Sequence, residues 1–172
     1  HGANQYAPMA GVPRLTQAIA EKADRNYGRH LDPENEITVT LGATEAIFNA
    51  IQTVIHKGDE AIVFDPAYDL YEPAVELAGG TCIHLPMTPD RFAIPWNRLR
   101  DSINEKTRLI IINSPHNPCG SVLGHDDLER LWQLIRNHRI FMISDEVYEH
   151  IIFDGLIHQS LLRHNGLAGR SF

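Results

Sequence analysis

Residues 109–120, Leu-Ile-Ile-Ile-Asn-Ser-Pro-His-Asn-Pro-Cys-Gly, place an apolar run directly before a loop that contains two prolines. A β-branched run without polar alternation is typical of a strand that is buried on both faces of a sheet. Proline fixes φ, so this loop is expected to be rigid and to hold the side chain of Asn117 in one position. The pattern recurs at 140–143, which precede Ser144-Asp-Glu-Val-Tyr148. We therefore expect buried strands that end in polar residues.

Strand-like and helix-like stretches alternate on both sides of this region. Strands joined by right-handed helical crossovers form a mainly parallel sheet with helices on both faces, an α/β three-layer sandwich. Ligands of such folds lie beyond the carboxyl ends of the strands, so the loops at 42–44, 65–68, 113–120 and 145–148 should converge on one rim. Residues 154–170 are too irregular to assign. The expected strands are 37–41, 61–64, 81–85, 109–112 and 140–143, and the expected helices are 13–27, 44–56, 68–78, 96–103 and 125–137.

Composition excludes several classes of protein. A chain of 172 residues with 43% hydrophobic residues is typical of one globular domain, and its net charge of −7 disfavours nucleic-acid binding. The only cysteines, Cys82 and Cys119, and the scattered histidines form no metal motif, so we expect no metal site and a reducing, cytoplasmic setting. No apolar run is long enough to span a membrane.

A glycine and a hydroxyl stand where the helix after residue 41 should begin. Free backbone N–H groups and the positive end of the helix dipole at Gly42-Ala43-Thr44 favour a phosphate. A plain glycine turn with Thr44 as the helix cap explains the same residues. Asp145 leaves a similar choice, because its carboxylate can hydrogen-bond the protonated ring nitrogen of a pyridine cofactor or cap a helix.

Three further side chains fall on the same expected rim. The hydroxyl of Tyr148 can hydrogen-bond a phenolate oxygen, and the amide of Asn117 can donate to a cofactor oxygen and a substrate carboxylate. The ring of Tyr68 can stack on a flat cofactor. An ordinary Asn-Pro turn and a tyrosine packed in the core are the structural alternatives for Asn117 and Tyr68. Glu146 is expected to be structural.

Four motifs in this chain resemble those of the class I/II aminotransferases of pyridoxal-5′-phosphate (PLP) fold type I. The opening Asn4-Gln-Tyr-Ala-Pro-Met-Ala-Gly11 and the stretch 144–150 are most similar to the branch that contains methionine aminotransferases and kynurenine–oxoglutarate transaminases. The resemblance covers nearly the whole chain and implies an incomplete PLP-binding large domain. The motifs, in the family's order and approximate spacing, are Gly42-Ala-Thr-Glu-Ala46, Asp65-Pro-Ala-Tyr-Asp69, Ser114-Pro-His-Asn-Pro-Cys-Gly120 and Ser144-Asp-Glu-Val-Tyr148.

The resemblance implies a role for each matched residue on the cofactor ring. Tyr68 would stack on the pyridine ring, and Asp145 would bind the ring nitrogen. Asn117 and Tyr148 would bind the phenolic oxygen, and Asn117 would also contact the substrate carboxylate.

The cofactor phosphate is assigned to other residues by the same resemblance. Backbone groups of Ala43 and Thr44 would hold it within one subunit. Tyr6 matches a tyrosine that reaches the partner's cofactor phosphate across the interface of a homodimer.

The family's Schiff-base lysine, which holds PLP covalently and moves protons during the reaction, is expected beyond Phe172 in a Ser-x-x-Lys motif. Lys22, Lys57 and Lys106 are expected to be solvated and away from the rim. Because the chain opens on His1 and ends without a closing helix, we expect a segment of a longer enzyme, inactive alone. It would be the first part of the large domain, without the N-terminal arm, the lysine-bearing part and the small domain.

The resemblance implies that the parent protein transfers an amino group from an α-amino acid, such as methionine, an aromatic amino acid or kynurenine, to a 2-oxo acid. A PLP-dependent cysteine-conjugate β-lyase and the effector domain of an aminotransferase-like transcription regulator remain alternatives. A nucleotide-binding domain is disfavoured, because the sequence contains neither GxGxxG nor GxxxxGK[ST] at the expected place.

Overall fold

The computed structural model describes residues 6–172. The chain divides into two compact units, residues 1–46 and 47–172. The boundary falls within helix α2 (Gly42–Val54), whose first turn belongs to the N-terminal unit.

Helix α1 (Pro13–Tyr27) is the main element of the N-terminal unit and has the predicted bounds. A proline in the first turn costs no hydrogen bond, because the amides there have no intrahelical acceptor. The helix ends at Gly28, which adopts the left-handed conformation (φ 66°) and donates its N–H to the Asp24 carbonyl at 2.8 Å. The buried face consists of Thr16, Ala20 and Ala23, spaced for one side of a helix.

The strand predicted at 37–41 is wrong. Residues 37–40 are irregular, and Val39 N–H donates a hydrogen bond to the Ala10 carbonyl at 2.9 Å. β-branched residues favour a strand only where a neighbouring strand offers partners, and in the described part of the chain this segment pairs with none. Residues 42–44, predicted as a loop after a strand, instead form the first turn of a helix (Gly42–Val54) that does not follow a strand of the sheet.

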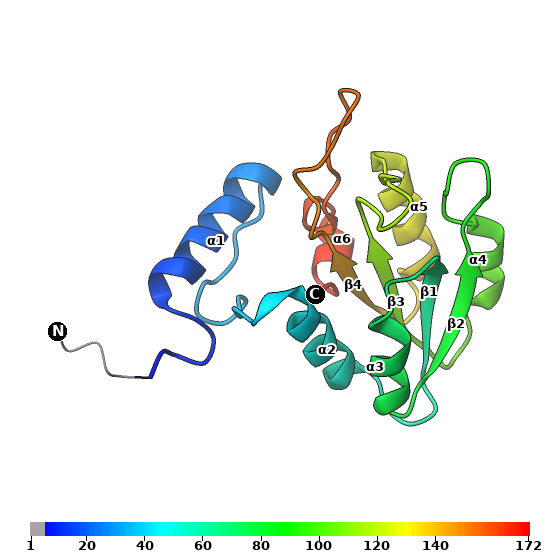
Figure 1. Ribbon diagram of the computed structural model, residues 1–172, viewed down its shortest axis with the longest axis horizontal. Helices are drawn as coiled ribbons and strands as arrows, with labels where there is room; N and C mark the ends of the chain where they lie inside the picture. Colours follow the sequence, from blue (N-terminus) through cyan, green and yellow to red (C-terminus); the bar gives the residue numbers. More distant parts are fainter. Residues whose placement is uncertain (1–5) are drawn as a thin grey trace. The chain divides into compact units, whose positions relative to one another are not determined.

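The C-terminal unit is built on a four-stranded parallel sheet with the order β2-β1-β3-β4 (Figure 1). The two central strands are almost entirely buried, as their unbroken apolar sequences predicted. The other four strands predicted from the sequence are thus confirmed, each with slightly different ends. Their bounds are β1 (Glu60–Asp65), β2 (Thr81–Pro86), β3 (Thr107–Asn113) and β4 (Phe141–Asp145).

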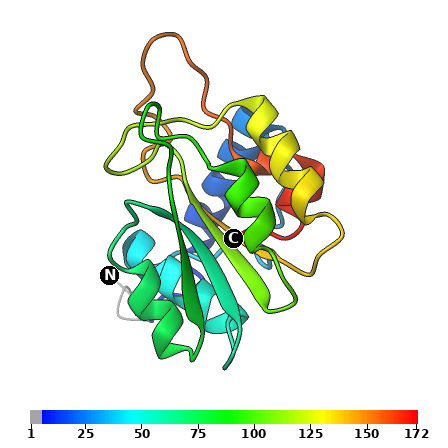
Figure 2. The ribbon, with the colours of Figure 1, turned by 90° about the vertical axis from the view of Figure 1, so that its right-hand side faces the viewer.

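Helices cover both faces of this sheet and complete the predicted three layers. Residues 47–54 of α2 and helix α3 lie on one side, and α4, α5 and α6 lie on the other (Figure 2). The amide of Gln52 donates to the Ala74 carbonyl at 2.8 Å and joins α2 to α3. On the opposite side, Leu99, Leu128 and Leu167 pack in one apolar core with Ile110 and other strand residues. The remaining bounds are α3 (Tyr71–Leu77), α4 (Trp96–Ser102), α5 (His125–Ile135), the 3₁₀ helix η1 (Leu161–Arg163) and α6 (Asn165–Ala168).

The last residues of the chain lie beside β4. Met142 N–H donates to the Arg170 carbonyl at 2.8 Å, and Ser144 N–H donates to the Phe172 carbonyl at 2.9 Å. Ser171 and Met142 form a parallel bridge. Residues 170–172 therefore run in the same direction as β4, toward its carboxyl end.

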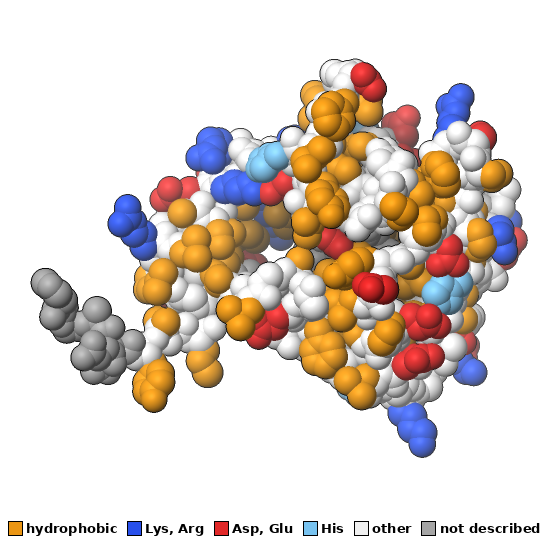
Figure 3. All heavy atoms as spheres, in the orientation of Figure 1, with side chains coloured by type: hydrophobic (Ala, Val, Ile, Leu, Met, Phe, Trp, Pro, Cys, Tyr) orange, Lys and Arg blue, Asp and Glu red, His pale blue; other side chains and the backbone are white. Residues whose placement is uncertain are grey.

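The segment between β4 and η1 projects from the C-terminal unit and carries exposed apolar side chains, visible over this segment in Figure 3. They include Phe153 and Ile157, which are 72% and 68% exposed. No helix within residues 6–172 is long and apolar enough to cross a bilayer.

Candidate functional site

The carboxyl ends of β1, β3 and β4 meet on one rim, because these strands are parallel and adjacent. Asp65, Asn113 and Asp145 are their last residues, and Asn113 is aligned with Asp145 in the register of β3 and β4. Three of the four predicted loops therefore converge. The fourth, at 42–44, belongs to the N-terminal unit.

The Asp145 carboxylate lies on this rim and is held by a buried tyrosine. The Tyr71 hydroxyl donates to Asp145 Oδ2 at 2.6 Å, whereas Oδ1 has only a long contact of 3.4 Å with Val147 N–H. Burial, and then the neighbouring carboxylate, raise the pKa of the Tyr71 hydroxyl, so this group stays protonated and donates. Residues 147–150 form turns and no helix begins after Asp145, so Asp145 is not a helix cap. Its second oxygen can accept a hydrogen bond from a ligand.

The side chain of Asn113 links two loops of the rim. Its Nδ2 donates to the Asp145 carbonyl at 2.9 Å, and its Oδ1 accepts from Asn117 N–H at 2.7 Å. Ser114 N–H also donates to the Asp145 carbonyl, at 3.1 Å. Because one amide serves both loops, Asn117 and Asp145 are kept in a fixed relation. Asn117 is half-buried and lies in the loop after β3, outside the strands of the sheet. Its side-chain amide is therefore available at the rim.

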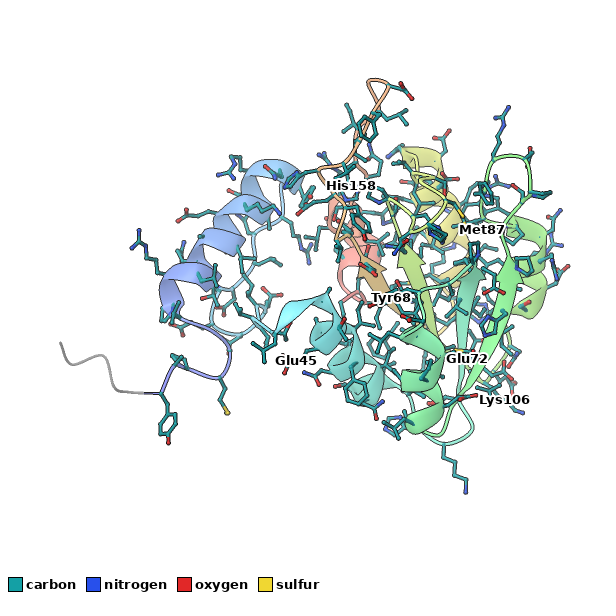
Figure 4. All side chains as sticks on the ribbon, in the orientation of Figure 1. Glu45, Tyr68, Glu72, Met87, Lys106 and His158 are labelled. Atoms are coloured by element: carbon teal, nitrogen blue, oxygen red, sulfur yellow. The ribbon has the colours of Figure 1, made fainter. Side chains whose placement is uncertain are left out.

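Two tyrosines on the rim are partly open to solvent. Tyr68, labelled in Figure 4, is 38% exposed, and its ring lies edge-on to that of Tyr71, with centroids 5.8 Å apart and an interplanar angle of 73°. Tyr68 is therefore not the core tyrosine of the structural alternative. Tyr148 is 37% exposed and lies in the turn that follows Asp145. Both side chains can contact a ligand at the rim.

The side chain of Glu146 joins the projecting segment between β4 and η1 to the end of β4. Its Oε2 lies 2.7 Å from His158 Nε2, and its Oε1 accepts from the Ser144 hydroxyl at 2.7 Å and from Leu161 N–H at 3.2 Å. Figure 4 labels His158 near the base of this segment. These bonds explain why a charged side chain is tolerated here and agree with its predicted structural role.

A cavity of about 310 Å³ adjoins the rim and shares Tyr71 and Asn113 with the Asp145 network. Its other lining residues include Phe64, Arg91 and His116. Burial lowers the pKa of His116, partly offset by a hydrogen bond to the Phe64 carbonyl, so the ring is neutral at physiological pH.

Ala43 and Thr44 lie in the first turn of α2, where backbone N–H groups have no intrahelical acceptor. Thr44 is inside the helix, so it is not the helix cap. The Glu45 carboxylate instead accepts from Leu41 N–H at 2.5 Å and leaves the first-turn amides to other acceptors. Tyr6 is fully exposed in the same unit.

Two of the three lysines lie at the opposite end of the sheet. Lys57 and Lys106 precede the first residues of β1 and β3, the amino ends of these parallel strands. Lys22 lies in α1 of the N-terminal unit. In the C-terminal unit, the rim thus carries no lysine among its described residues.

Within residues 6–172, no three His, Cys, Asp or Glu side chains lie close enough together to hold a metal ion.

Tyr71 and Asn113 were missed by sequence reasoning. Asn113 stands at a strand end beside the motif, a position that could have pointed to it. For Tyr71 the signal is weaker, because an aromatic residue in an amphipathic helix usually packs in the core.

A model of the family "Aminotransferase class I and II" matches residues 1–170. The chain belongs to this family. It is 49% identical over 170 residues to methionine aminotransferase of Escherichia coli, and 34% identical over 178 residues to human kynurenine–oxoglutarate transaminase 3. The matches cover 99% and 98% of this chain.

Solved structures of aminotransferases share the fold. The crystal structure of the Escherichia coli methionine aminotransferase superposes with a TM-score of 0.96, over 99% of this chain and 45% of the other, at 49% identity. The N-succinyldiaminopimelate aminotransferase of Mycobacterium tuberculosis gives 0.94 over the same shares, at 41% identity. The chain spans about 44% of the length of the Escherichia coli enzyme.

Proposed function

We propose that these residues are the first part of the PLP-binding large domain of a transaminase, which moves an amino group from an α-amino acid to a 2-oxo acid. The observation that carries the proposal is the Asp145 carboxylate at the end of β4, held through Oδ2 by Tyr71 and bordered by Tyr148 and the Asn117 loop. This donor and acceptor set fits a pyridine ring with a protonated nitrogen and a phenolic oxygen.

Each rim residue has one task in this proposal. Asp145 Oδ1 accepts from the ring nitrogen, and Asn117 and Tyr148 donate to the phenolic oxygen. Tyr68 supplies an exposed ring for stacking. PLP, when bound, supplies an electron-withdrawing ring that accepts the negative charge left when the substrate Cα loses its proton.

The phosphate belongs, in the proposal, to the N-terminal unit. The first-turn amides of Ala43 and Thr44 offer donors at the positive end of a helix of 13 residues. Tyr6 would reach the phosphate bound by a partner subunit, and its full exposure is compatible with an interface role. We accordingly propose a homodimer with shared sites.

The direction of residues 170–172 supports a lysine beyond Phe172. Ser171 bridges Met142 in a parallel register, so a residue three positions after Ser171 would be level with Asp145. An amine there would reach the same rim and could both hold the cofactor and move the substrate proton.

The cellular compartment and the amino donor are proposed from the free cysteines and from sequence similarity. The thiols of Cys82 and Cys119 are free, which is typical of the cytoplasm. The similarity to methionine and kynurenine transaminases favours a methionine, aromatic or kynurenine-like donor.

The test is an assay of the full-length polypeptide that contains these residues. Purified with PLP, it should convert at least one of methionine, phenylalanine, tyrosine or kynurenine to its oxo acid, with a 2-oxo acid as obligatory acceptor. Transfer is followed by formation of the new amino acid. Release of pyruvate and ammonia from a cysteine conjugate, without any acceptor and without transamination, would instead identify a lyase.

Asp145→Asn should lower kcat/KM by on the order of a hundredfold or more, because it replaces a charged partner of the ring nitrogen in a partly buried site. Asp101→Asn, an exposed change in α4, is the control and should leave kcat/KM within about twofold. Equal activity of both variants would remove Asp145 from the cofactor site.

A further inference from the structure

We infer that Tyr71 is a positioning residue of the cofactor site, which fixes the Asp145 carboxylate through its hydroxyl and supports Tyr68 through its ring. This inference rests on the proposed function. It assigns a task to a residue outside the four motifs that identified the family.

The hydroxyl of Tyr71 determines which carboxylate oxygen is left for a ligand. A carboxylate on a strand end can rotate about two side-chain bonds, and either oxygen could meet a ring nitrogen. The 2.6 Å bond to Oδ2 has the length of a strong hydrogen bond between a hydroxyl and an ionised acceptor. It leaves Oδ1, with its 3.4 Å contact to Val147 N–H, as the oxygen able to accept from the ring.

Tyr71 is itself held firmly enough to act as a fixed point. It is 3% exposed, lies at the start of α3, and its backbone N–H donates to the Tyr68 carbonyl at 3.2 Å. Its ring meets the ring of Tyr68 edge-on, a favourable arrangement of two aromatic side chains. One buried residue therefore positions both the partner of the ring nitrogen and the residue that stacks on the ring.

The chemistry of Tyr71 points to positioning and not to proton transfer. Burial and the adjacent carboxylate both raise the pKa of its hydroxyl, so the hydroxyl keeps its proton at physiological pH. A group that keeps its proton cannot serve as a base. It can serve as a permanent donor.

The test is a double-mutant cycle in the full-length protein, with Tyr71→Phe, Asp145→Ala and the double variant. The probe is pyridoxamine 5′-phosphate, whose binding needs no covalent bond, and the readout is its dissociation constant from quenching of tryptophan fluorescence. Tyr71→Phe should weaken binding by on the order of tenfold, as expected for loss of a hydrogen bond to a charged group. In the Asp145→Ala background it should change binding by less than about twofold, because the group it acts through is gone.

A second readout follows the ring nitrogen directly. With ¹⁵N-labelled cofactor, the ring nitrogen bound to Tyr71→Phe should lose its proton at lower pH than in the unaltered protein. Tyr27→Phe, at the end of α1, is the matched control and should change neither readout. Thermal unfolding of each apo variant separates loss of binding from loss of the fold.

Each outcome decides between the two proposals. If the unaltered protein fails to bind the probe, both the proposed function and this inference are overturned. If it binds, and Tyr71→Phe matches it in affinity and in the ¹⁵N titration, the inference alone is overturned. Equal effects of Tyr71→Phe with and without Asp145 would also overturn it, since the effect would then not pass through the carboxylate.

Discussion

The amide of Asn113 shows how much a single residue can contribute to the geometry of the rim. It donates to the Asp145 carbonyl and accepts from Asn117 N–H, so it uses both of its functions on two different loops. A carboxylate of the same size cannot do both, because it has no N–H to donate. The relation between the two loops therefore depends on asparagine at this position.

Asn113→Ala should lower the free energy of unfolding by about 2 kcal/mol, since it removes two hydrogen bonds that contribute about 1 kcal/mol each. It should also weaken binding of pyridoxamine 5′-phosphate, because the Asn117 loop loses its anchor. Urea unfolding and fluorescence titration measure the two effects. Asn137→Ala, at an exposed position after α5, is the control.

Asn113→Asp separates the two bonds. The aspartate keeps an acceptor for Asn117 N–H but places an oxygen against the Asp145 carbonyl. It should therefore be at least as harmful as Asn113→Ala. If Asn113→Asp changed neither the free energy of unfolding nor the binding of the probe, the hydrogen bond from Asn113 Nδ2 to the Asp145 carbonyl would contribute to neither.

The connection between α3 and β2 sets the position of Tyr71 at the level of whole elements. Gly79 adopts φ 87° and donates its N–H to the Glu76 carbonyl at 2.9 Å, and Gly80 N–H donates to the Val75 carbonyl at 3.0 Å. The chain turns within two residues and brings the end of α3 close to β2.

Gly80→Ala should destabilise the protein by roughly 1–3 kcal/mol, the usual cost of overpacking a dense core. An added Cβ would lie 2.6 Å from Ile55 Cγ2 and 3.2 Å from the Asp59 carbonyl oxygen. The matched control is Gly169→Ala, where the nearest atom, the Asn165 carbonyl oxygen, is 3.9 Å away. Thermal or urea unfolding of both variants tests the prediction, and equal stabilities would contradict it.

At the scale of the whole C-terminal unit, the strand order β2-β1-β3-β4 places β1 and β3 inside the sheet and β2 at its edge. β1 is bonded to strands on both sides, and β3 likewise, and both are buried nearly throughout. β2 lies at the edge with one partner, and half of its residues are exposed. Protection of backbone amides should therefore differ among strands of the same sheet.

Hydrogen exchange of the full-length protein should be slowest for amides of β1 and β3 and measurably faster for β2, because local opening frees an edge strand at lower cost. Mass spectrometry of peptides from each strand measures the order. β2 exchanging as slowly as β3 would mean that another segment of the polypeptide covers this edge.

Much of the sheet could be predicted because its strands carry unbroken apolar runs. The segments around Ile110 and Ile143 have no polar alternation, and a strand buried on both faces needs none. Residues 37–41 have a similar β-branched composition, yet within residues 6–172 no strand pairs with them. The sequence of a segment does not show which strand will pair with it. Helix α3 begins at Tyr71 instead of Tyr68, because the turn after β1 occupies the residues between.

The sequence predicted the position of those rim residues that follow a strand or lie in one of the four motifs. Tyr68, Asn117, Asp145 and Tyr148 all lie on the rim of one unit. Tyr71 could not be predicted, since its contact with Asp145 depends on how α3 packs and not on any local pattern. The roles of these four residues in binding a cofactor stay predictions, as do those of Ala43, Thr44 and Tyr6.

The hydrogen bond between Tyr71 and Asp145 joins residues that are 74 positions apart in the chain. When β1, α3 and β3 have left the ribosome but β4 has not, Tyr71 lacks its partner Asp145, and the rim lacks the end of β4. Closing so long a loop is an entropic cost that is recovered only after the later strand has docked. The proposed site for the cofactor ring is thus completed only after β4 has emerged and paired, and before that point a growing chain has no Asp145 beside Tyr71 to bind the ring.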